Sequence, residues 1–254
     1  MHGRLLSVIA ALSLFAPSGA AQGQISAAEF RARRDSLAVR MGSGVLVAFG
    51  GRTPVSDFGP FYQLPAFHYL TNFDEPDAAF VMVVKDGHPA STIFVMPIDP
   101  RVAFYYGRRP DSATVTHTLG VAARGFAALG GVVDSLASTG LPFYTLADFA
   151  DADFARQDSL TRGTVFMRAL LARHPGLVVK DAHPMVNDLR AHKSAAEIAL
   201  LKRAAEISSA AHIAVMRAPE PRHEYEIQAV LEGTFTRLGG ERPAYGSIVG
   251  AGRN

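Results

Sequence analysis

The stretch AFVMVVKDGHPASTIFVMP, residues 79–97, carries two short apolar runs on either side of an Asp-Gly pair. Short runs rich in Val, Ile and Phe favour strands, because branched and aromatic side chains pack well on a pleated surface. Asp86-Gly87 is a strong hairpin signal, since both residues tolerate the positive φ angles of a tight turn. Residues 79–85 and 91–97 are therefore predicted to pair as a hairpin, which puts a β-sheet in the fold.

Helix and strand patterns alternate around this hairpin. Ser26 followed by Glu29 has the spacing of a capping box at the start of an amphipathic helix, where two backbone N–H groups find side-chain acceptors. The further expected elements are helices at 25–41, around 120–138 and at 163–173, and strands at 44–51, 141–146 and 176–181. Helices interleaved with strands predict a layered α/β or α+β architecture.

The character of the chain changes after about residue 186, where two long helices are expected. The first spans about 194–217 and opens with a second capping box, formed by Ser194 and Glu197. The second spans about 224–238 and stops at a Gly-Gly pair, a common way to end a helix. The predicted domains are residues 22–186 and residues 187–254.

The N-terminal segment, residues 1–21, has the layout of a cleaved secretory signal. A basic residue, Arg4, precedes an apolar run at 5–16, and small residues precede Gln22. The apolar run is too short to span a bilayer core of ~30 Å as a helix. We expect export to the periplasm or the medium; the alternative is a buried first helix.

Composition excludes several classes of function. The net charge is only +2 and the basic residues are scattered, so neither nucleic acid nor an anionic membrane surface is expected as a partner. The sequence has no cysteine, which excludes disulfides, a thiolate nucleophile and a lipoprotein attachment point. After the N-terminal segment no run is apolar enough for a membrane helix, so no membrane anchor is expected.

Simple catalytic motifs are absent. The stretch RHEYEI, residues 222–227, has Ile227 where a zinc peptidase helix needs its second histidine. YGSIVG, residues 245–250, lacks the spacing of a nucleophilic serine elbow. The acidic segment DFADADF, residues 148–154, lacks the turn glycine and closing glutamate of a calcium loop, which favours a solvated loop. The residues alone therefore show no active site.

The last third of the chain nevertheless resembles a known family. NDLRAHKSAAEIALLKRAAEISSAAH, residues 187–212, resembles the opening of the catalytic domain of the pita-bread metallopeptidase superfamily, and residues 224–254 resemble its continuation through PAYGSIVGAGRN. Two further stretches, FHYLTNFDEPDAAFVMV (67–83) and FYYGRRP (104–110), resemble the aminopeptidase P group within it. The resemblance implies a creatinase-like N-terminal domain followed by the opening helices and first strand of a pita-bread domain.

This resemblance also implies an activity. Members of the group hydrolyse the bond between an N-terminal residue and a following proline, with two divalent metal ions, usually manganese, that share a bridging hydroxide. Oxygen-rich carboxylate ligands suit such a hard ion. The implied substrates are peptides with proline at the second position, and the implied full-length protein is a homo-oligomer.

Few site residues carry over from the resemblance. In the family the metal ligands and the catalytic histidine follow the Ile-Val-Gly-x-Gly-x-Asn stretch, so neither a catalytic residue nor a metal ligand is assigned. Tyr245 and Asn254 are candidates that line or brace the metal pocket. Tyr105 occupies a position where the group often has tryptophan, and it is a candidate subunit contact together with Arg108 and Arg109.

We therefore expect a chain truncated early in the catalytic domain, which binds no metal and is inactive alone. Its two long helices are expected to expose apolar faces, because the sheet that covers them in the family is missing. Two alternatives remain open at this point. The chain could come from another hydrolase of the superfamily, a prolidase or a creatinase-like enzyme, or it could be a non-catalytic binding or oligomerisation module.

Overall fold

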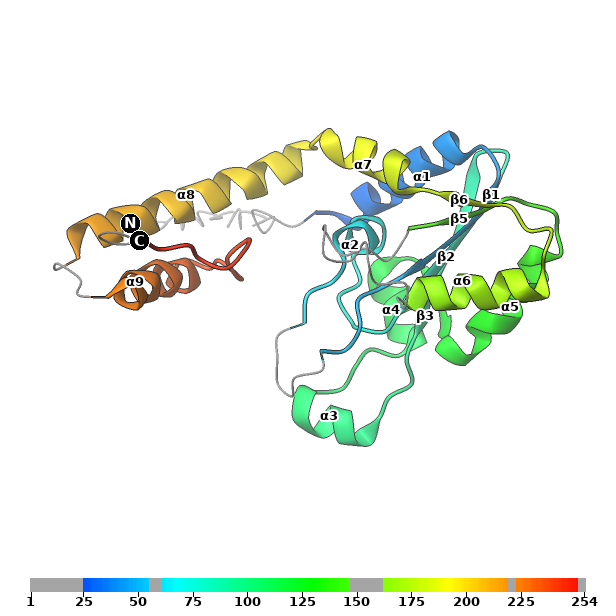
Figure 1. The fold of residues 1–254 in the computed structure, drawn as a ribbon, viewed down its shortest axis with the longest axis horizontal. Helices are drawn as coiled ribbons and strands as arrows, with labels where there is room; N and C mark the ends of the chain where they lie inside the picture. The colour runs from blue at the N-terminus through cyan, green and yellow to red at the C-terminus, as the bar shows by residue number, and fades with distance from the viewer. Residues whose placement is uncertain (1–24, 55–60, 147–161, 219–222, 251–254) are drawn as a thin grey trace, which may run out of the picture. The chain divides into compact units, whose positions relative to one another are not determined.

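The computed structural model describes residues 25–54, 61–146, 162–218 and 223–250, which fall into two compact units (Figure 1). The larger unit ends at Lys193, whereas the sequence places the change of domain near residue 186. The predicted signal segment, residues 1–21, and the acidic loop at 148–154 lie outside the described residues. None of the helices in the described ranges is at once long and apolar enough to cross a bilayer.

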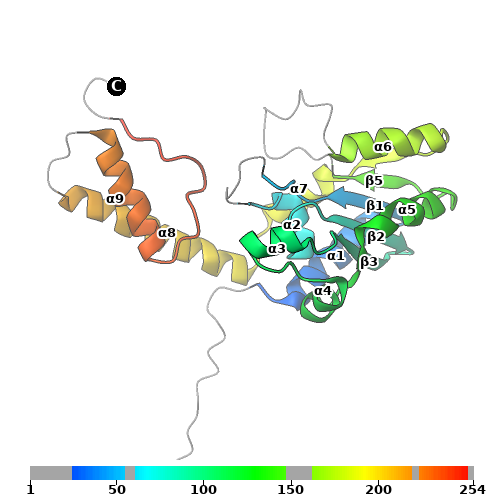
Figure 2. The same ribbon diagram turned by 90° about the horizontal axis from the view of Figure 1, so that it is seen from below.

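A mixed sheet forms the centre of the larger unit. Its strands, in the order β4-β3-β2-β1-β5-β6, are β4 (Ala122–Gly125), β3 (His88–Val95), β2 (Ala79–Lys85), β1 (Gly44–Phe49), β5 (Phe143–Thr145) and β6 (Val179–Asp181). Strand β2 runs antiparallel to both neighbours, and the other three pairings are parallel. Figure 2 shows β5, β1, β2 and β3 side by side in this order. The predicted layered fold around a sheet is confirmed.

The β2–β3 hairpin closes with the predicted turn. Asp86 and Gly87 have φ angles of 50° and 77°, the pair of positive values that a two-residue hairpin turn requires. Lys85 pairs with His88 directly beyond the turn. Strand β3 therefore starts three residues before the predicted position 91, because the turn needs only two residues rather than a five-residue loop.

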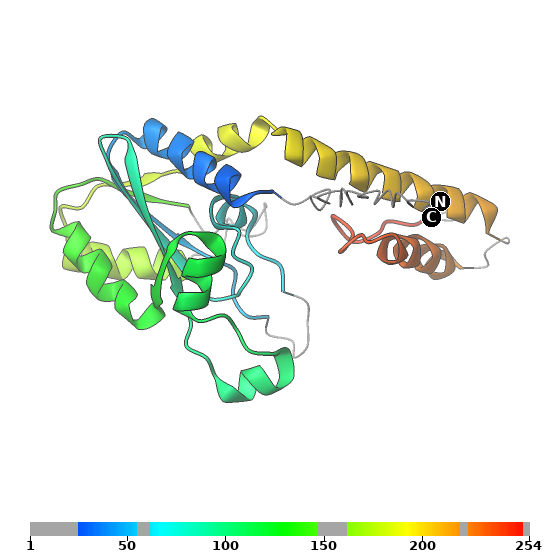
Figure 3. The same cartoon turned by 180° about the vertical axis from the view of Figure 1, so that it is seen from behind.

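Both faces of the sheet are covered by helices. Strand β1 is buried along its whole length, with Leu46 and Ala48 in one core and Val45, Val47 and Phe49 in the other, as expected when successive side chains point to opposite faces. The first core is closed by α1 (Ala27–Met41), α2 (Pro65–Thr71), α4 (Ser112–Leu119) and α7 (His183–Ala191). The second is closed by η1 (Phe126–Ala128), α5 (Leu129–Ala137) and α6 (Arg162–Arg173). Figures 1 and 3 show α1 and α7 on the side of the sheet opposite to α5 and α6.

Helix α1 shows how its sequence starts and anchors it. The Ser26 side chain accepts a hydrogen bond from the Glu29 N–H at 3.2 Å, which satisfies one of the free donors of the first turn. The Glu29 carboxylate contacts Arg33 Nη2 at 2.6 Å, one turn further on. The Ser26 cap is therefore present, but the glutamate of the predicted capping box is engaged by an i, i+4 ion pair.

The helix expected around 120–138 is only partly correct. Helix α5 begins at Leu129, and the preceding segment Ala122–Gly125 forms the edge strand β4. This strand pairs in parallel with residues 92–95 of β3. Tertiary pairing at a free sheet edge outweighs the helix preference of the alanines, because intrinsic propensity is worth less than ~1 kcal/mol per residue.

The smaller unit contains the two predicted long helices, α8 (Ala195–Arg217) and α9 (Glu224–Arg237). The capping box at the start of α8 is confirmed: the Ser194 Oγ accepts from the Glu197 N–H at 3.1 Å, and the Glu197 carboxylate accepts from the Ser194 N–H at 2.8 Å. The two helices pack together, and the Arg203 guanidinium donates to the Leu238 carbonyl at 2.8 Å just beyond α9.

Much of α8 lies exposed. Ile198, Leu201 and Met216 are 43%, 55% and 79% exposed, and its buried residues are Ile207 and Ala211. The smaller unit thus presents the apolar helix surface that the sequence predicts.

The first strand of the pita-bread domain, which the resemblance implies and which PAYGSIVGAGRN would supply at residues 247–249, is not formed. Residues 241–250 have no regular secondary structure, and all the strands that the described ranges contain lie between Gly44 and Asp181. A strand exists only through its hydrogen-bonded neighbour, and the described part of the smaller unit offers none. The expectation of a first strand at 247–249 is therefore wrong for this structure.

Candidate functional site

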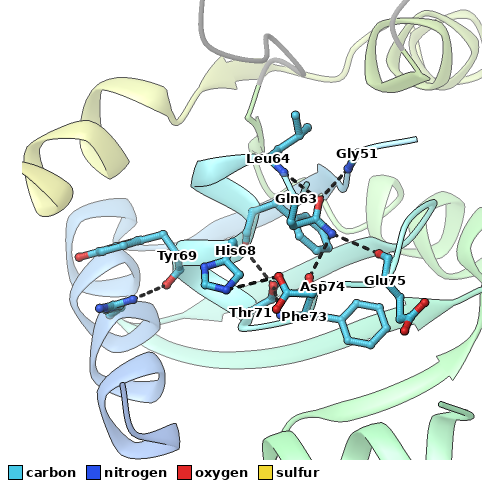
Figure 4. Close-up of polar contacts among 11 residues, drawn as sticks. Gly51, Gln63, Leu64, His68, Tyr69, Thr71, Phe73, Asp74 and Glu75 are labelled. Atoms are coloured by element: carbon cyan, nitrogen blue, oxygen red, sulfur yellow. Dashed lines mark hydrogen bonds and ion pairs between the residues drawn. The ribbon is translucent and has the colours of Figure 1, made fainter. Parts of the chain in front are cut away.

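Gln63 joins three loop segments, 50–54, 61–64 and 72–77, at the end of the sheet where β1 finishes and β2 starts (Figure 4). Its Oε1 accepts from the N–H groups of Gly51 at 2.7 Å and Leu64 at 3.0 Å. Its Nε2 donates to the carbonyl oxygens of Phe73 at 3.0 Å and Glu75 at 3.2 Å. These four bonds use both donors and both lone-pair directions of the amide. One side chain therefore fixes the segment 72–77, called here the hinge loop.

The hinge loop begins at the C-terminus of α2, which two buried arginines stabilise. Asn72 has the left-handed φ of 54° that ends the helix. Arg33 donates to the Tyr69 carbonyl at 3.3 Å and Arg34 donates to the Leu70 carbonyl at 2.9 Å. These carbonyls belong to the last turn, where no intrahelical donor is available. Burial lowers the pKa of Arg34 from its ordinary value, while the guanidinium still serves as a donor.

A contact between a histidine and an aspartate lies at the surface beside this turn. His68 Nε2 lies 3.4 Å from Asp74 Oδ1 (Figure 4). The Phe30 ring meets the imidazole edge-on, with the centroids 6.0 Å apart. The His68 and Asp74 side chains are 40% and 71% exposed. Solvent screens such a pair, so its contribution to stability is at most ~1 kcal/mol.

Asp77 ties the end of the hinge loop to residues 50–54. It adopts a φ of 62°, and its N–H donates to the Gly51 carbonyl at 2.8 Å. Its carboxylate accepts from the Thr53 N–H at 3.3 Å and faces Arg162 Nη1 at 3.8 Å. The Arg162 guanidinium in turn lies 4.4 Å from the centre of the Phe126 ring. Backbone and side-chain contacts thus hold both ends of the hinge loop.

The middle of the hinge loop contacts a residue from a distant part of the sequence. Glu75 Oε2 lies 3.5 Å from Arg109 Nε, and Arg109 Nη2 donates to Thr53 Oγ1 at 3.5 Å. Glu75 belongs to the stretch 67–83 and Arg109 to the stretch 104–110, the two stretches that carry the resemblance to the aminopeptidase P group. The structure therefore joins these two stretches at one place.

Helix α3 (Pro100–Tyr106) lies directly before this contact and has no buried residue. Three consecutive aromatic residues on it, Phe104, Tyr105 and Tyr106, are 82%, 64% and 56% exposed. The rings of Phe104 and Tyr105 meet edge-on at 5.1 Å. An exposed apolar cluster on an otherwise unburied helix is typical of a contact surface.

The predicted subunit-contact residues Tyr105, Arg108 and Arg109 differ in their exposure. Tyr105 and Arg108 are exposed. Arg109 is only 20% exposed and makes its contacts within its own chain. Gln63, Glu75 and Asp77 were not singled out from the sequence, because polar residues in loops are too common to mark a site before their partners are known.

Of the two predicted pocket residues, the structure describes only Tyr245, and no described group of His, Asp or Glu side chains forms a metal cluster. Tyr245 is 74% exposed in the irregular segment 241–250. The nearby Ser247 side chain contributes, after Gln228, to holding the pKa of Glu232 below its usual range. Asn254 lies outside the described residues. The pocket role of Tyr245 and Asn254 stays a prediction.

The described residues bring no set of metal ligands together. Within the described ranges, no three His, Asp or Glu side chains come close enough together to hold an ion. The acid–histidine contacts in these ranges are pairs, for example His174 Nε2 with Asp134 Oδ1 at 3.1 Å and His183 Nδ1 with Asp181 Oδ1 at 3.5 Å. A divalent ion in a catalytic site takes three or more protein ligands. The described residues therefore do not form a metal centre by themselves.

A groove of about 580 Å³ opens at the opposite end of the strands, where β5 and β6 begin. Arg173, His174 and Lys180 are among the residues that line it. The hydrogen bond from His174, followed by that from Arg173, holds the pKa of Asp134 below its usual range. Because Asp134 engages two of the three basic side chains, the groove is less basic than its lining suggests.

Two family models match the chain in sequence order. Residues 30–139 match the aminopeptidase P N-terminal domain, and residues 199–254 match metallopeptidase family M24. The first match contains the hinge loop, α3 and most of the sheet. The second covers α9, nearly all of α8 and the segment that follows.

Individual relatives agree with these models. An Xaa-Pro aminopeptidase from Escherichia coli (strain K12) is 30% identical over 240 residues, which are 91% of this chain and 54% of that protein. The structure of aminopeptidase P from E. coli in its low-pH form superposes with a TM-score of 0.76 at 28% identity, over 87% of this chain and 52% of that one. A zinc-substituted E. coli aminopeptidase P in complex with product gives a TM-score of 0.73 at 28% identity, with the same coverage. The chain spans about half the length of the curated relatives it matches.

Proposed function

We propose that this chain, which belongs to the aminopeptidase P family, supplies the accessory domain and the start of the catalytic domain of a metal-dependent Xaa-Pro aminopeptidase. The observation that carries the proposal is the order of the two matches on one chain, residues 30–139 followed by residues 199–254. The relative with 30% identity over 240 residues supports it, because that alignment spans both matches.

The proposed substrates are peptides with proline at the second position. Proline lacks a backbone N–H and has a fixed φ, so a peptide bond that precedes it differs in shape and in hydrogen bonding from the bonds that general peptidases cleave. The names of the relatives, which are Xaa-Pro aminopeptidases, support this substrate class.

The proposed cofactor of the whole enzyme is a pair of divalent metal ions, with manganese as the resident metal. The match to a metallopeptidase family and the zinc-substituted structure support a divalent metal. The described residues of this chain do not fit such a centre, as the contacts above show. We therefore assign to this chain no step that runs through the metal ions.

The 254-residue chain on its own is expected to release no N-terminal residue from an Xaa-Pro peptide. It spans 54% of the E. coli relative, and we propose that the metal ligands belong to the part of the enzyme that this chain does not match. The measurement is hydrolysis of an Xaa-Pro peptide in the presence of Mn²⁺, with the E. coli enzyme as the positive control.

Titration calorimetry with Mn²⁺ on the same preparation is expected to show no tight binding. Metal-dependent release of the N-terminal residue by the purified chain would contradict its proposed inactivity. The family activity itself is tested separately, by the same assay on the protein encoded by the whole reading frame. If that whole protein cleaved other peptides but not Xaa-Pro peptides, the proposed specificity would be overturned.

For the larger unit we propose two roles, to narrow access to the active site and to contact a second copy in a homo-oligomer. The aromatic residues of α3 support the second role. Phe104, Tyr105 and Tyr106 are exposed side by side in sequence, on a helix none of whose residues is buried. Arg108, exposed beside them, is the other contact residue that we propose.

We further propose export, directed by residues 1–21. The intact mass of protein recovered from the periplasm or the medium is expected to match a chain that starts at Gln22. A Leu12→Arg variant, which interrupts the apolar run, should stay inside the cell with residues 1–21 attached, whereas Leu12→Ile should be exported. Retention of residues 1–21 in exported protein would contradict the proposed cleavage.

A further inference from the structure

Helix α3 needs support from outside itself. It has only seven residues, from Pro100 to Tyr106, and none of them is buried. Helices this short are not stable alone in water, because nucleation costs more than a few hydrogen bonds return. The Asp99 carboxylate accepts from the Arg101 N–H at 2.8 Å and caps the first turn of α3. A cap does not determine where the helix lies relative to the sheet.

Arg109 follows α3 in the chain and can hold the helix in place. Gly107, with a φ of 82°, ends α3 and turns the chain back toward the sheet edge. Arg109 lines a small cavity of about 20 Å³ together with Ile98, Val102 and Ala103, which places it beside the first half of the α3 segment. The remaining lining residues are Pro97 and Asp99.

The guanidinium of Arg109 reaches the hinge loop at the same time. Its Nε lies 3.5 Å from Glu75 Oε2, and its Nη2 donates to Thr53 Oγ1 at 3.5 Å. Glu75 is itself held in place, because its carbonyl accepts from Gln63 Nε2 at 3.2 Å. The arginine therefore connects a helix without buried residues to the loop that Gln63 holds in place.

We propose that Arg109 and Glu75 act as a positioning pair that fixes α3, and with it the aromatic residues 104–106, on the edge of the larger unit. The side chains are 20% and 36% exposed, so solvent screens the pair less than a fully exposed one. Its benefit to subunit contact rests on the proposed function: a surface that is already ordered loses less conformational entropy when it binds.

The absence of tryptophan from the sequence gives a clean reporter. In a Tyr105→Trp background, Arg109→Ala is expected to lower the fluorescence anisotropy of the introduced indole, and Glu75→Ala is expected to lower it less, because Arg109 keeps its hydrogen bond to Thr53. Hydrogen exchange of the α3 amides should rise about three- to tenfold, the effect of losing one partly exposed ion pair with its hydrogen bond. Arg108→Ala, which removes a neighbouring exposed cation, should change neither quantity.

The double variant Arg109→Ala with Glu75→Ala should loosen α3 no more than Arg109→Ala alone, because Arg109→Ala already removes the contact with Glu75. The charge swap Arg109→Glu with Glu75→Arg should restore part of the order. Unchanged anisotropy in both single variants, or effects that simply add, would overturn the positioning pair. Exchange of β1–β3 peptides serves as the internal reference for folding. If the β1–β3 peptides also lose protection, Arg109→Lys replaces Arg109→Ala in the comparison. Lysine keeps the positive charge but has a single nitrogen, so it cannot reach Glu75 and Thr53 with two separate nitrogens.

Sedimentation velocity on the same variants separates this inference from the proposed function. If the variants loosen α3 and weaken self-association, both stand. If α3 loosens while self-association is unchanged, the positioning pair stands and the subunit-contact role of α3 fails. If α3 stays ordered in every variant, the positioning pair fails whatever the oligomeric state.

Discussion

Phe80→Ala is expected to lower the free energy of unfolding of the larger unit by about 3–5 kcal/mol, the range for removal of a buried phenylalanine. Phe80 is fully buried in β2, where it pairs with Ala48 of β1 and Ile93 of β3. The substitution removes apolar contact and leaves a cavity that strands on both sides prevent from closing. Because whole domains are stable by only ~5–15 kcal/mol, this variant should be close to unfolding.

Phe104→Ala is the matched control, because it deletes the same ring from a residue that is 82% exposed. Its effect on unfolding should stay within about 0.5 kcal/mol. Hydrogen exchange of β1–β3 peptides across a urea series measures the larger unit alone, which matters because the chain contains two units. Equal losses of stability in the two variants would contradict the assignment of β2 to the centre of the core.

Local signals account for the parts of the fold that the sequence predicts well. The β2–β3 turn depends on two adjacent residues, Asp86 and Gly87, and the start of α8 depends on the Ser194–Glu197 spacing. Helices α3 and α4 were not predicted, since seven or eight residues give too few turns for a periodic apolar pattern. Strand β4 was missed for another reason: only its neighbour β3 makes residues 122–125 a strand.

The contacts of the candidate site could be predicted less well from the sequence than the fold. The stretches 67–83 and 104–110 were marked by resemblance, but nothing in either predicts that Glu75 faces Arg109. That contact depends on where the sheet places two loops, and the side chains at such a junction are set by tertiary structure. Arg109, which the sequence predicts at a subunit contact, bonds to Glu75 and Thr53 of its own chain, and this geometry makes it a candidate positioning residue.

Gln63→Leu is expected to destabilise the larger unit by about 2–4 kcal/mol. The side chain makes four hydrogen bonds, to the N–H groups of Gly51 and Leu64 and to the carbonyls of Phe73 and Glu75. Leucine has a similar size but satisfies none of them, and each unsatisfied buried group costs about 1–3 kcal/mol. The site is partly buried, so water can replace some of the lost bonds, which keeps the expected total below the sum of four.

Amide exchange gives the direct readout of this loss. The Gly51 and Leu64 N–H groups, which donate to Gln63 in the parent chain, should lose protection in Gln63→Leu. Gln228→Leu is the control: Gln228 is also partly buried, but its amide makes only one hydrogen bond that the structure records, to Glu232 one turn further along α9, at 2.9 Å. That variant should cost less than about 1 kcal/mol, the typical net value of one hydrogen bond.

Gln63→Glu separates the two halves of the interaction, because it keeps the acceptors and removes the donors. The introduced carboxylate can still accept from Gly51 and Leu64, so their amides should keep protection, while it meets the carbonyl oxygens of Phe73 and Glu75 without a proton to share. Folding should therefore raise the pKa of that carboxyl, since the protonated form regains one donor. The destabilisation is then largest above the folded-state pKa and becomes smaller as the pH falls through it. A Gln63→Glu variant whose stability relative to the parent chain does not depend on pH would show that the donors to the hinge loop contribute nothing, and it would remove the basis for treating Gln63 as the residue that fixes Glu75.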